Sequence, residues 1–314
     1  MKRLAVFLSV IIIMLAVFPQ IVSAGPGPHG GGYTATTDAC AGCHRAHTAT
    51  QGNLLTTTTE ALCLTCHGST AAGAQTNVTD GVYGQYRNSS AVYVNKDVTE
   101  AEGTVGDPLL GGGFDYYQLQ GQAGFSAATS YHDVSGTATS VWGLGEANTG
   151  QTADMESGLT CGTCHDPHGS PNYRILRESV NGHTLPQITS LEDGTWDYTA
   201  EHWGNGMSAF CAACHENYGE GGPINTGGVV HFRHDIDMNY STGGNENPET
   251  VGFEGYTLPL ANSGQGDIVV CTTCHLPHGS SAAQGENSAA ADITGDSSLL
   301  RIDNRGVCEV CHQK

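Results

Sequence analysis

The sequence predicts a fold made mostly of irregular chain and short α-helices, with minor β-structure and a small apolar core. Only 38% of the 314 residues are hydrophobic, whereas 44 are glycine. No helical stripe of apolar residues extends beyond a few turns. All twelve cysteines fall in six copies of one short motif. A chain of this length and composition has too few apolar side chains to fill two ordinary domains.

The N-terminus predicts a secretory signal peptide over residues 1–24. Two basic residues precede an apolar run over residues 4–18, and Val22-Ser23-Ala24 forms a small-residue cleavage site. The run is shorter than the roughly 20 residues that a membrane-spanning helix needs, which disfavours the alternative of an uncleaved anchor. We therefore expect an exported protein, extracellular or at the cell surface, with the periplasm as the alternative. No membrane span is expected in the mature chain.

The charge of the chain is strongly acidic. Removal of Lys2 and Arg3 with the signal peptide leaves 9 basic and 31 acidic side chains, a net charge of -22. A surface of this sign repels nucleic acid, so we expect no nucleic-acid partner. Basic partners and metal cations are favoured, and the alternative is that the acidity only keeps an exported protein soluble.

Every cysteine lies in a Cys-x-x-Cys-His motif. Numbered 1 to 6 along the chain, the motifs are Cys40-Cys43-His44, Cys63-Cys66-His67, Cys161-Cys164-His165, Cys211-Cys214-His215, Cys271-Cys274-His275 and Cys308-Cys311-His312. Structural disulfides and zinc sites are the alternatives, but neither calls for a histidine after every cysteine pair.

The motif indicates covalent attachment of c-type haem. Two thiols at i and i+3 lie on one side of a helical turn and form thioethers with the haem, and the following histidine binds the iron. The sequence therefore predicts six c-type haems, with the six motif histidines as proximal ligands. This leaves about 48 mature residues per haem, so we expect irregular chain and short helices wrapped round a chain of haems.

The motifs form three two-haem modules in tandem. Module 1 covers residues 25–68, module 2 covers 161–215 and module 3 covers 271–314, separated by inserts at 69–160 and 216–270. In each module the first motif is followed by a histidine three residues later and then by a Leu/Ile-Leu doublet, whereas the second motif lacks that histidine.

The first insert is rich in Gly, Tyr and Thr. Its segment "GVYGQYRNSSAVYVN" over residues 81–95 predicts a short β-hairpin, and residues 143–158 predict a loop. Long irregular segments of this kind can be buried against haem faces.

Nine histidines lie outside the motifs, and six irons need at most six of them as distal ligands. His47, His168 and His278 each follow a proximal histidine by three residues. None of these three can reach its own iron, because so short a tether cannot pass round the macrocycle. We expect each to bind a neighbouring haem iron, and the alternative is a solvated loop histidine.

A second group precedes the modules. His132 and His234 begin the sequence His-Asp-Val/Ile, and His29 has the corresponding place before module 1. We expect these three to bind the irons of first motifs, and we expect His168 to serve motif 4. The remaining residues that could replace a distal ligand are His183, His202 and His231, and the methionines Met155, Met207 and Met238.

The three modules resemble the doubled-CXXCH multihaem cytochromes of anaerobic bacteria and archaea. The segment "HGGGYTATTDACAGCHRAH" over residues 29–47 is also similar to the mature N-termini of outer-surface cytochromes of metal-reducing bacteria, some of which polymerise into conductive filaments. The resemblance implies a homopolymer in which a histidine of one subunit binds a haem of the next. His29 and His47 are the candidates for that histidine.

An iron with two histidine ligands has no open position, so it exchanges electrons and does not bind substrate. We expect an electron-transfer protein with no catalytic residues, which passes electrons to other cytochromes or to an extracellular acceptor. The alternatives are a discrete periplasmic carrier and a haem subunit of a redox complex. A multihaem reductase is disfavoured, because all six motifs end in histidine.

Overall fold

The structure is a computed structural model. It describes residues 29, 39–70, 73–96, 105–120, 124–138, 141, 158–191, 202–203, 205–219, 222–226, 229–240, 248, 256–262, 267–283, 298–303 and 306–312. The backbone alone is described at residues 39, 190–191, 202–203, 223–226, 229–232 and 262. The predicted signal peptide, and the predicted loop 143–158 except its last residue, lie outside the described residues.

Each α-helix of the described part contains at least one motif cysteine. The helices are α2 (Ala39–Cys43), α3 (Thr59–His67), α4 (Cys161–Cys164), α5 (Met207–Ala212), α6 (Cys271–Cys274) and α7 (Gly306–Glu309). Three of these α-helices are followed by a short 3-10 helix: α2 by η1 (Gly52–Leu54), α4 by η2 (Tyr173–Ile175) and α5 by η3 (Glu216–Tyr218). The helical turn brings cysteines at i and i+3 to one side.

The strands of the described part are two to five residues long and pair antiparallel. They are β1 (Thr76–Asn77), β2 (Val82–Tyr83), β3 (Gln85–Arg87), β4 (Tyr93–Asn95), β5 (Tyr116–Tyr117), β6 (Ser126–Ala127), β7 (Ser130–Tyr131), β8 (Ser179–Val180), β9 (His183–Thr184), β10 (Ser190–Leu191), β11 (His202–Trp203), β12 (Gly222–Thr226), β13 (Val229–Arg233), β14 (Met238–Asn239), β15 (Ala261–Asn262), β16 (Asp267–Val269) and β17 (Gly279–Ser280). Most form two-stranded ladders, and β14, β16 and β15 form a three-stranded sheet. The hairpin predicted over 81–95 is confirmed, since β3 pairs with β4 in the register Tyr86 to Val94.

The apolar core is divided into small clusters. The largest joins module 2 to the end of the second insert through Tyr173, Leu176, Ile188, Phe210 and Val270. None of the clusters formed by the described residues includes a residue of module 1. The side chains described for α2, η1 and α3 include no buried one.

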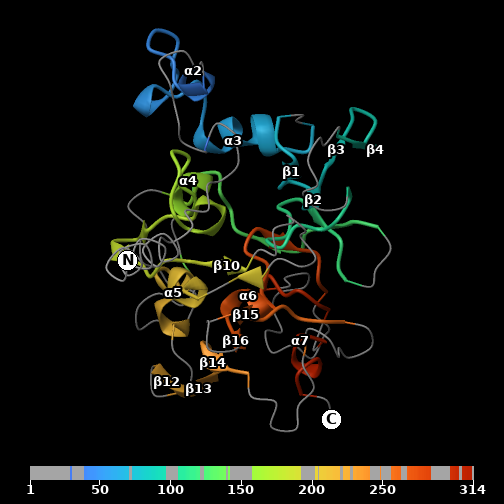
Figure 1. Ribbon diagram of the computed structural model, residues 1–314, viewed down its shortest axis with the longest axis vertical. Coiled ribbons are helices and arrows are strands. Elements are labelled where there is room, and N and C mark those ends of the chain that lie inside the picture. The colour runs from blue at the N-terminus through green and yellow to red at the C-terminus, as the bar shows by residue number, and fades with distance from the viewer. Residues whose placement is uncertain are drawn as a thin grey trace, which may run out of the picture.

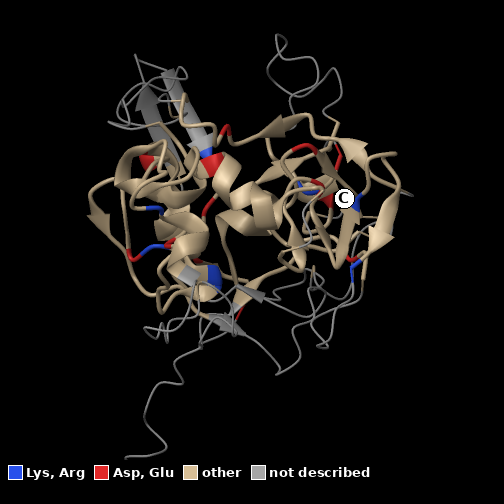
Figure 2. Cartoon of the chain, turned by 90° about the horizontal axis from the view of Figure 1, so that it is seen from above, with Lys and Arg blue, Asp and Glu red and all other residues tan. Residues whose placement is uncertain are grey.

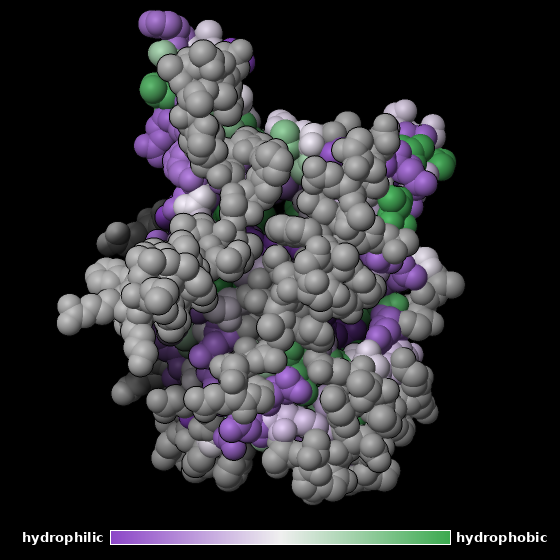
Figure 3. Space-filling model, in the orientation of Figure 1, coloured by the Kyte–Doolittle hydropathy of each residue, from purple (hydrophilic) through white to green (hydrophobic). Residues whose placement is uncertain are grey.

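Module 1 therefore stands apart from the core. Figure 1 places α2 at one end of the longest axis, and α7 with the C-terminus towards the other end. In Figure 3 the same end projects as a narrow lobe beyond the body of the molecule.

The first insert packs against module 3, which is distant in sequence. β7 pairs with β17, and the amide of His278 donates to the Gly111 carbonyl at 2.7 Å. Phe114 stacks on the His278 ring with the centroids 4.9 Å apart. Gly112 has a φ of 81°, and a Cβ there would overlap the Gly279 carbonyl oxygen, so this close approach requires glycine.

Charged residues are sparse and scattered over the described ribbon (Figure 2). No helix in the described ranges has the length and apolar character needed to cross a membrane.

Candidate haem-ligand sites

The first motif of each module ends in the same backbone turn. The motif histidine forms an isolated antiparallel bridge with the second doublet residue: His44 with Leu55, His165 with Leu176, and His275 with Leu300. The two residues before that partner have left-handed backbones, with φ between 49° and 61°: Asn53 and Leu54, Arg174 and Ile175, Ser298 and Leu299. Left-handed residues other than glycine cost about 1–2 kcal/mol each. Strain of this kind persists where the surroundings hold a functional group in place.

This turn fixes the tautomer of the motif histidine. Nδ1 donates to the carbonyl of the residue before the doublet: His44 to Asn53 (2.8 Å), His165 to Arg174 (2.9 Å) and His275 to Ser298 (2.8 Å). With the proton on Nδ1, the lone pair of Nε2 remains free for a metal. The doublet is visible in the sequence, but its role is not, because any residue type can offer the accepting carbonyl.

Five of the six motif histidines face a second histidine ring from elsewhere in the chain. The ring centroids are 6.0 to 6.3 Å apart in the pairs His44–His168, His67–His29, His165–His278, His215–His132 and His312–His234. A metal bound to one nitrogen of each ring, at roughly 2 Å per bond, separates the two centroids by about 6 Å. The spacing therefore fits one iron between the rings of each pair, as in a haem with two histidine ligands.

Several of the facing rings are also held by Nδ1. His29 donates to the Pro167 carbonyl at 2.8 Å, and His132 donates to the Pro277 carbonyl at 2.6 Å. His234 instead donates to the carbonyl of its own neighbour, Asp235, at 2.7 Å. In all three the Nε2 lone pair remains available to a metal.

Burial keeps several rings neutral. Desolvation, followed by the charge of the facing His29, lowers the pKa of His67 to about 4. Burial likewise lowers the pKa of His278 to about 3, with His165 as the next cause. Burial also lowers the pKa of His132 and of His165. A neutral imidazole retains the lone pair that binds a metal, so these rings can act as ligands at neutral pH.

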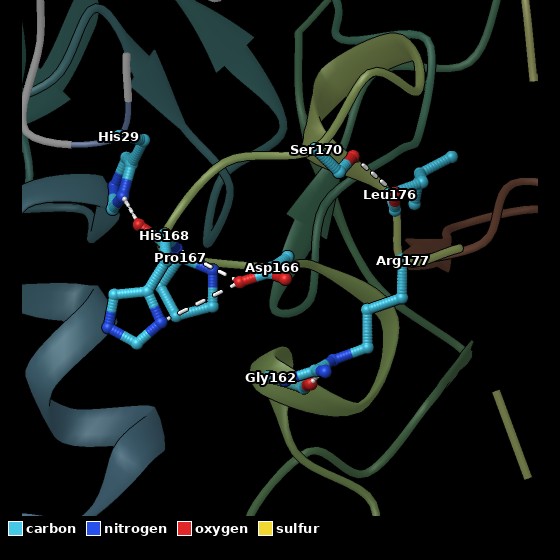
Figure 4. A network of polar contacts seen from close by, with 8 residues as sticks. All are labelled: His29, Gly162, Asp166, Pro167, His168, Ser170, Leu176 and Arg177. Carbon is cyan, nitrogen blue, oxygen red and sulfur yellow. Dashed lines mark hydrogen bonds and ion pairs between the residues drawn. The ribbon is translucent and has the colours of Figure 1, made fainter. Parts of the chain in front are cut away.

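Figure 4 shows the surroundings of His168. The Oδ1 atom of Asp166 accepts the amide of His168 at 3.0 Å and lies 3.8 Å from its Nδ1. The adjacent Pro167 carbonyl accepts the hydrogen bond from His29 (Figure 4). One loop of module 2 thus presents His168 to motif 1 and steadies His29, the ring that faces motif 2.

The pairs differ from those expected from sequence. His29, His132 and His234 face histidines of second motifs, not of first motifs. His168 faces His44 of motif 1, not motif 4. The reason is that each first motif is reached by the loop of the following module, a contact between distant segments that local spacing does not encode.

Motif 5 is different. Among the side chains that the structure describes, no histidine ring forms such a pair with His275, although burial lowers the pKa of this histidine as it does that of His165. His47 is exposed, and no ring of the described part pairs with it. Within the described residues, His47 and motif 5 therefore do not meet in one chain.

The other candidate ligands lie elsewhere. His183 is exposed on β9, with its Nε2 3.7 Å from Oε1 of Glu216, an ion pair when the ring is protonated. The side chains of His202 and His231 lie outside the described residues. The methionines differ in their surroundings: Met207 is buried in the core, Met238 is exposed and Met155 lies outside the described residues.

Motifs of successive modules touch through their first cysteines. The Cys63 thiol donates a hydrogen bond to Cys161, which raises the pKa of Cys63 and lowers that of Cys161. The Cys211 thiol donates to Cys271 with the same effect on the two pKa values. With haem bound these sulfurs would be thioethers and would not donate hydrogen bonds. The contacts still show that motif 2 lies beside motif 3 and that motif 4 lies beside motif 5.

The other three contacts, between motifs 1 and 2, 3 and 4, and 5 and 6, also join motifs that are consecutive along the chain. Three thiols have a pKa that is raised first by burial and then by the charge of a thiol in the next motif. They are Cys43, which lies near Cys63, Cys164, which lies near Cys214, and Cys274, which lies near Cys311. Each motif therefore lies near the next one along the chain, from motif 1 to motif 6.

Cysteine pairs on helical turns, each followed by a histidine, are the donor set of covalently bound c-type haem. This donor set supports a c-type cytochrome, and it points to a protein of electron transfer rather than to an enzyme. The family model described as "Doubled CXXCH motif" matches residues 34–72 and 153–182 and supports a multihaem cytochrome. No curated protein and no solved structure matches the chain.

Arg301, which follows the doublet of module 3, ties that module to the first insert. Its Nε donates to the Thr272 carbonyl at 2.7 Å, and its Nη2 donates to the Leu110 carbonyl at 2.9 Å. Arg301→Met is expected to leave these carbonyls without their donors and to lower the free energy of unfolding by about 2 kcal/mol. Thermal unfolding measures the change, with the exposed Arg45 as the control in Arg45→Met. Equal midpoints for the two variants would contradict the assignment.

Proposed function

We propose that the chain binds six c-type haems in one continuous row and conducts electrons along it to an acceptor outside the cell. The proposal includes assembly of copies head to tail, so that the row continues from one copy to the next. When bound, c-type haem supplies an iron that alternates between the ferrous and ferric states.

The order of the motifs is the observation that carries the proposal. Each motif has thiols close enough to those of the next for their pKa values to interact, at all five steps along the chain. The five facing ring pairs add distal ligands of the kind that closes an iron to substrate. Both features favour electron transfer along a row.

The exposed His47 supports assembly. His29 faces His67 within the chain, which leaves His47 as the remaining candidate for ligation between copies. His168 faces motif 1 and His278 faces motif 3, so each first motif pairs with the histidine of the following module. For His275 the following module is module 1 of another copy, and its corresponding histidine is His47.

We propose that the protein is exported and acts at the cell surface. Intact-mass measurement of the purified protein is expected to give a chain that begins at residue 25 and carries six haems. A chain that retains the predicted signal peptide, or carries fewer haems, would contradict this part of the proposal.

Microscopy separates the polymer from the second candidate, a discrete periplasmic carrier or haem subunit. Negative-stain images of the purified protein are expected to show fibres, with more of the protein in fibres at higher concentration. Monodisperse particles at all concentrations would favour the discrete carrier and reject the polymer. The observation that favours the polymer is that His275 lacks a facing ring among the described side chains while His47 is exposed.

A further inference from the structure

The chain contains two joints between modules, and both are built in the same way. At the first, α3 packs against α4 and Cys63 contacts Cys161. At the second, α5 packs against α6 and Cys211 contacts Cys271. At each joint the helix of a second motif therefore lies against the helix of the first motif in the next module.

The histidines repeat this pattern. At the first joint, His29 donates to the Pro167 carbonyl, directly before the ligand histidine of module 2. At the second joint, His132 donates to the Pro277 carbonyl, directly before the ligand histidine of module 3. A joint thus combines a helix contact, a contact between cysteines, a facing ring pair and one hydrogen bond to the carbonyl before the incoming histidine.

The two ends of the chain carry the unmatched halves of such a joint. Cys40 on α2 and Cys308 on α7 are exposed, whereas the four cysteines that meet at the two joints are partly buried. His234, the counterpart of His29 and His132, donates only to its neighbour Asp235. Together with His47 and His275, these residues are what a third joint requires.

We infer that the contact between copies is this third joint: α7 of one copy packs against α2 of the next, and His234 donates to the Ala46 carbonyl of the next copy. Ala46 directly precedes His47, as Pro167 precedes His168 and Pro277 precedes His278. The inference rests on the proposed assembly and specifies its surface. The partner is a second copy of this chain.

The positions of the two surfaces agree with this partner. Figure 1 places α2 and α7 towards opposite ends of the longest axis, so the two do not meet within one copy, and the joint is a head-to-tail contact, which gives an open row when its rotation does not close a ring. The projecting lobe that carries α2 lacks buried side chains among those described, as expected for a surface that is covered only on assembly.

Gly42 on α2 provides the test. A Cβ at Gly42 meets nothing within 4 Å, so a side chain there is accommodated by the single chain. Its counterparts, the second variable residues of motifs 3 and 5, are the half-buried Thr163 and the buried Thr273. Gly42→Arg is therefore expected to abolish fibres. Because Gly42 lies between the two cysteines of motif 1, the loss of fibres is assigned to the joint only when intact mass shows that all haems are attached. Negative stain, sedimentation velocity and intact mass measure these results.

Ala61→Arg is the matched control. Ala61 is exposed on α3 in the same lobe, and α3 already has its partner, α4, within the chain. This variant is expected to form fibres like the unmodified protein. Gly42→Arg should also shorten fibres when mixed with the unmodified protein, because its α7 end still joins a copy whereas its α2 end is blocked. Ala61→Arg should join the fibres without shortening them.

The outcomes separate this inference from the proposed assembly. Normal fibres from Gly42→Arg would overturn the α7–α2 joint, and the assembly itself would stand. Absence of fibres in the unmodified protein would overturn both. Loss of fibres in Gly42→Arg but not in Ala61→Arg would support the joint.

Discussion

Replacing His47 with alanine is expected to convert fibres into single copies and to make one iron of six high-spin in the ferric state. The reason is that the iron bound by His275 then has no second imidazole, whereas the other five motif histidines each face a ring of the same chain. Electron paramagnetic resonance of the oxidised protein measures the high-spin fraction, and negative stain measures assembly.

Two further variants control for ligation of His275 within one chain. His202→Ala and His231→Ala remove the two candidate distal histidines whose side chains lie outside the described residues. If either variant gives the high-spin iron and His47→Ala does not, the ligand comes from the same chain and His47 is a solvated residue. Dissociated copies of the unmodified protein should show the same high-spin fraction as His47→Ala.

Replacing His168 with alanine is expected to leave all haems attached and to make the iron at motif 1 high-spin. The rings of His44 and His168 are 13° from parallel, whereas those of His215 and His132 are 62° apart. Near-parallel imidazole planes give a rhombic low-spin ferric spectrum, and strongly crossed planes give one with a large principal g value. His168→Ala should therefore remove intensity from the rhombic component.

His132→Ala is the comparison for this experiment. It should remove intensity from the large-g component, because it affects the crossed pair at motif 4. An unchanged low-spin spectrum in His168→Ala would mean that His168 is a loop residue. Loss of the large-g component in His168→Ala would mean that His168 binds the iron at motif 4, as the sequence predicted.

The covalent chemistry could be predicted from the sequence because it is local. Two cysteines and a histidine within five residues specify attachment wherever the chain places them, and the alternation of motifs with and without a further histidine reveals the modules. The hairpin of β3 and β4 could be predicted for the same reason, since short-range pairing depends on adjacent residues.

The pairing of histidines could not be predicted, because it depends on how modules pack. His168 faces His44 only because α3 lies against α4, a contact that no spacing in the sequence reports. The carbonyl that accepts from His44 belongs to Asn53, and the equivalent residues are Arg174 and Ser298. A role that belongs to the backbone leaves no residue type to recognise.

Because His275 lacks a facing ring among the described side chains, the proposed joint implies a way to count filament ends. Under the proposed joint, the vacant position at motif 5 is filled whenever another copy follows, so it persists only in the last copy of a filament. The fraction of irons that remain open then falls in inverse proportion to the number of copies. Carbon monoxide binds only to ferrous haem with a vacant or displaceable position, so its binding stoichiometry would report mean filament length in solution.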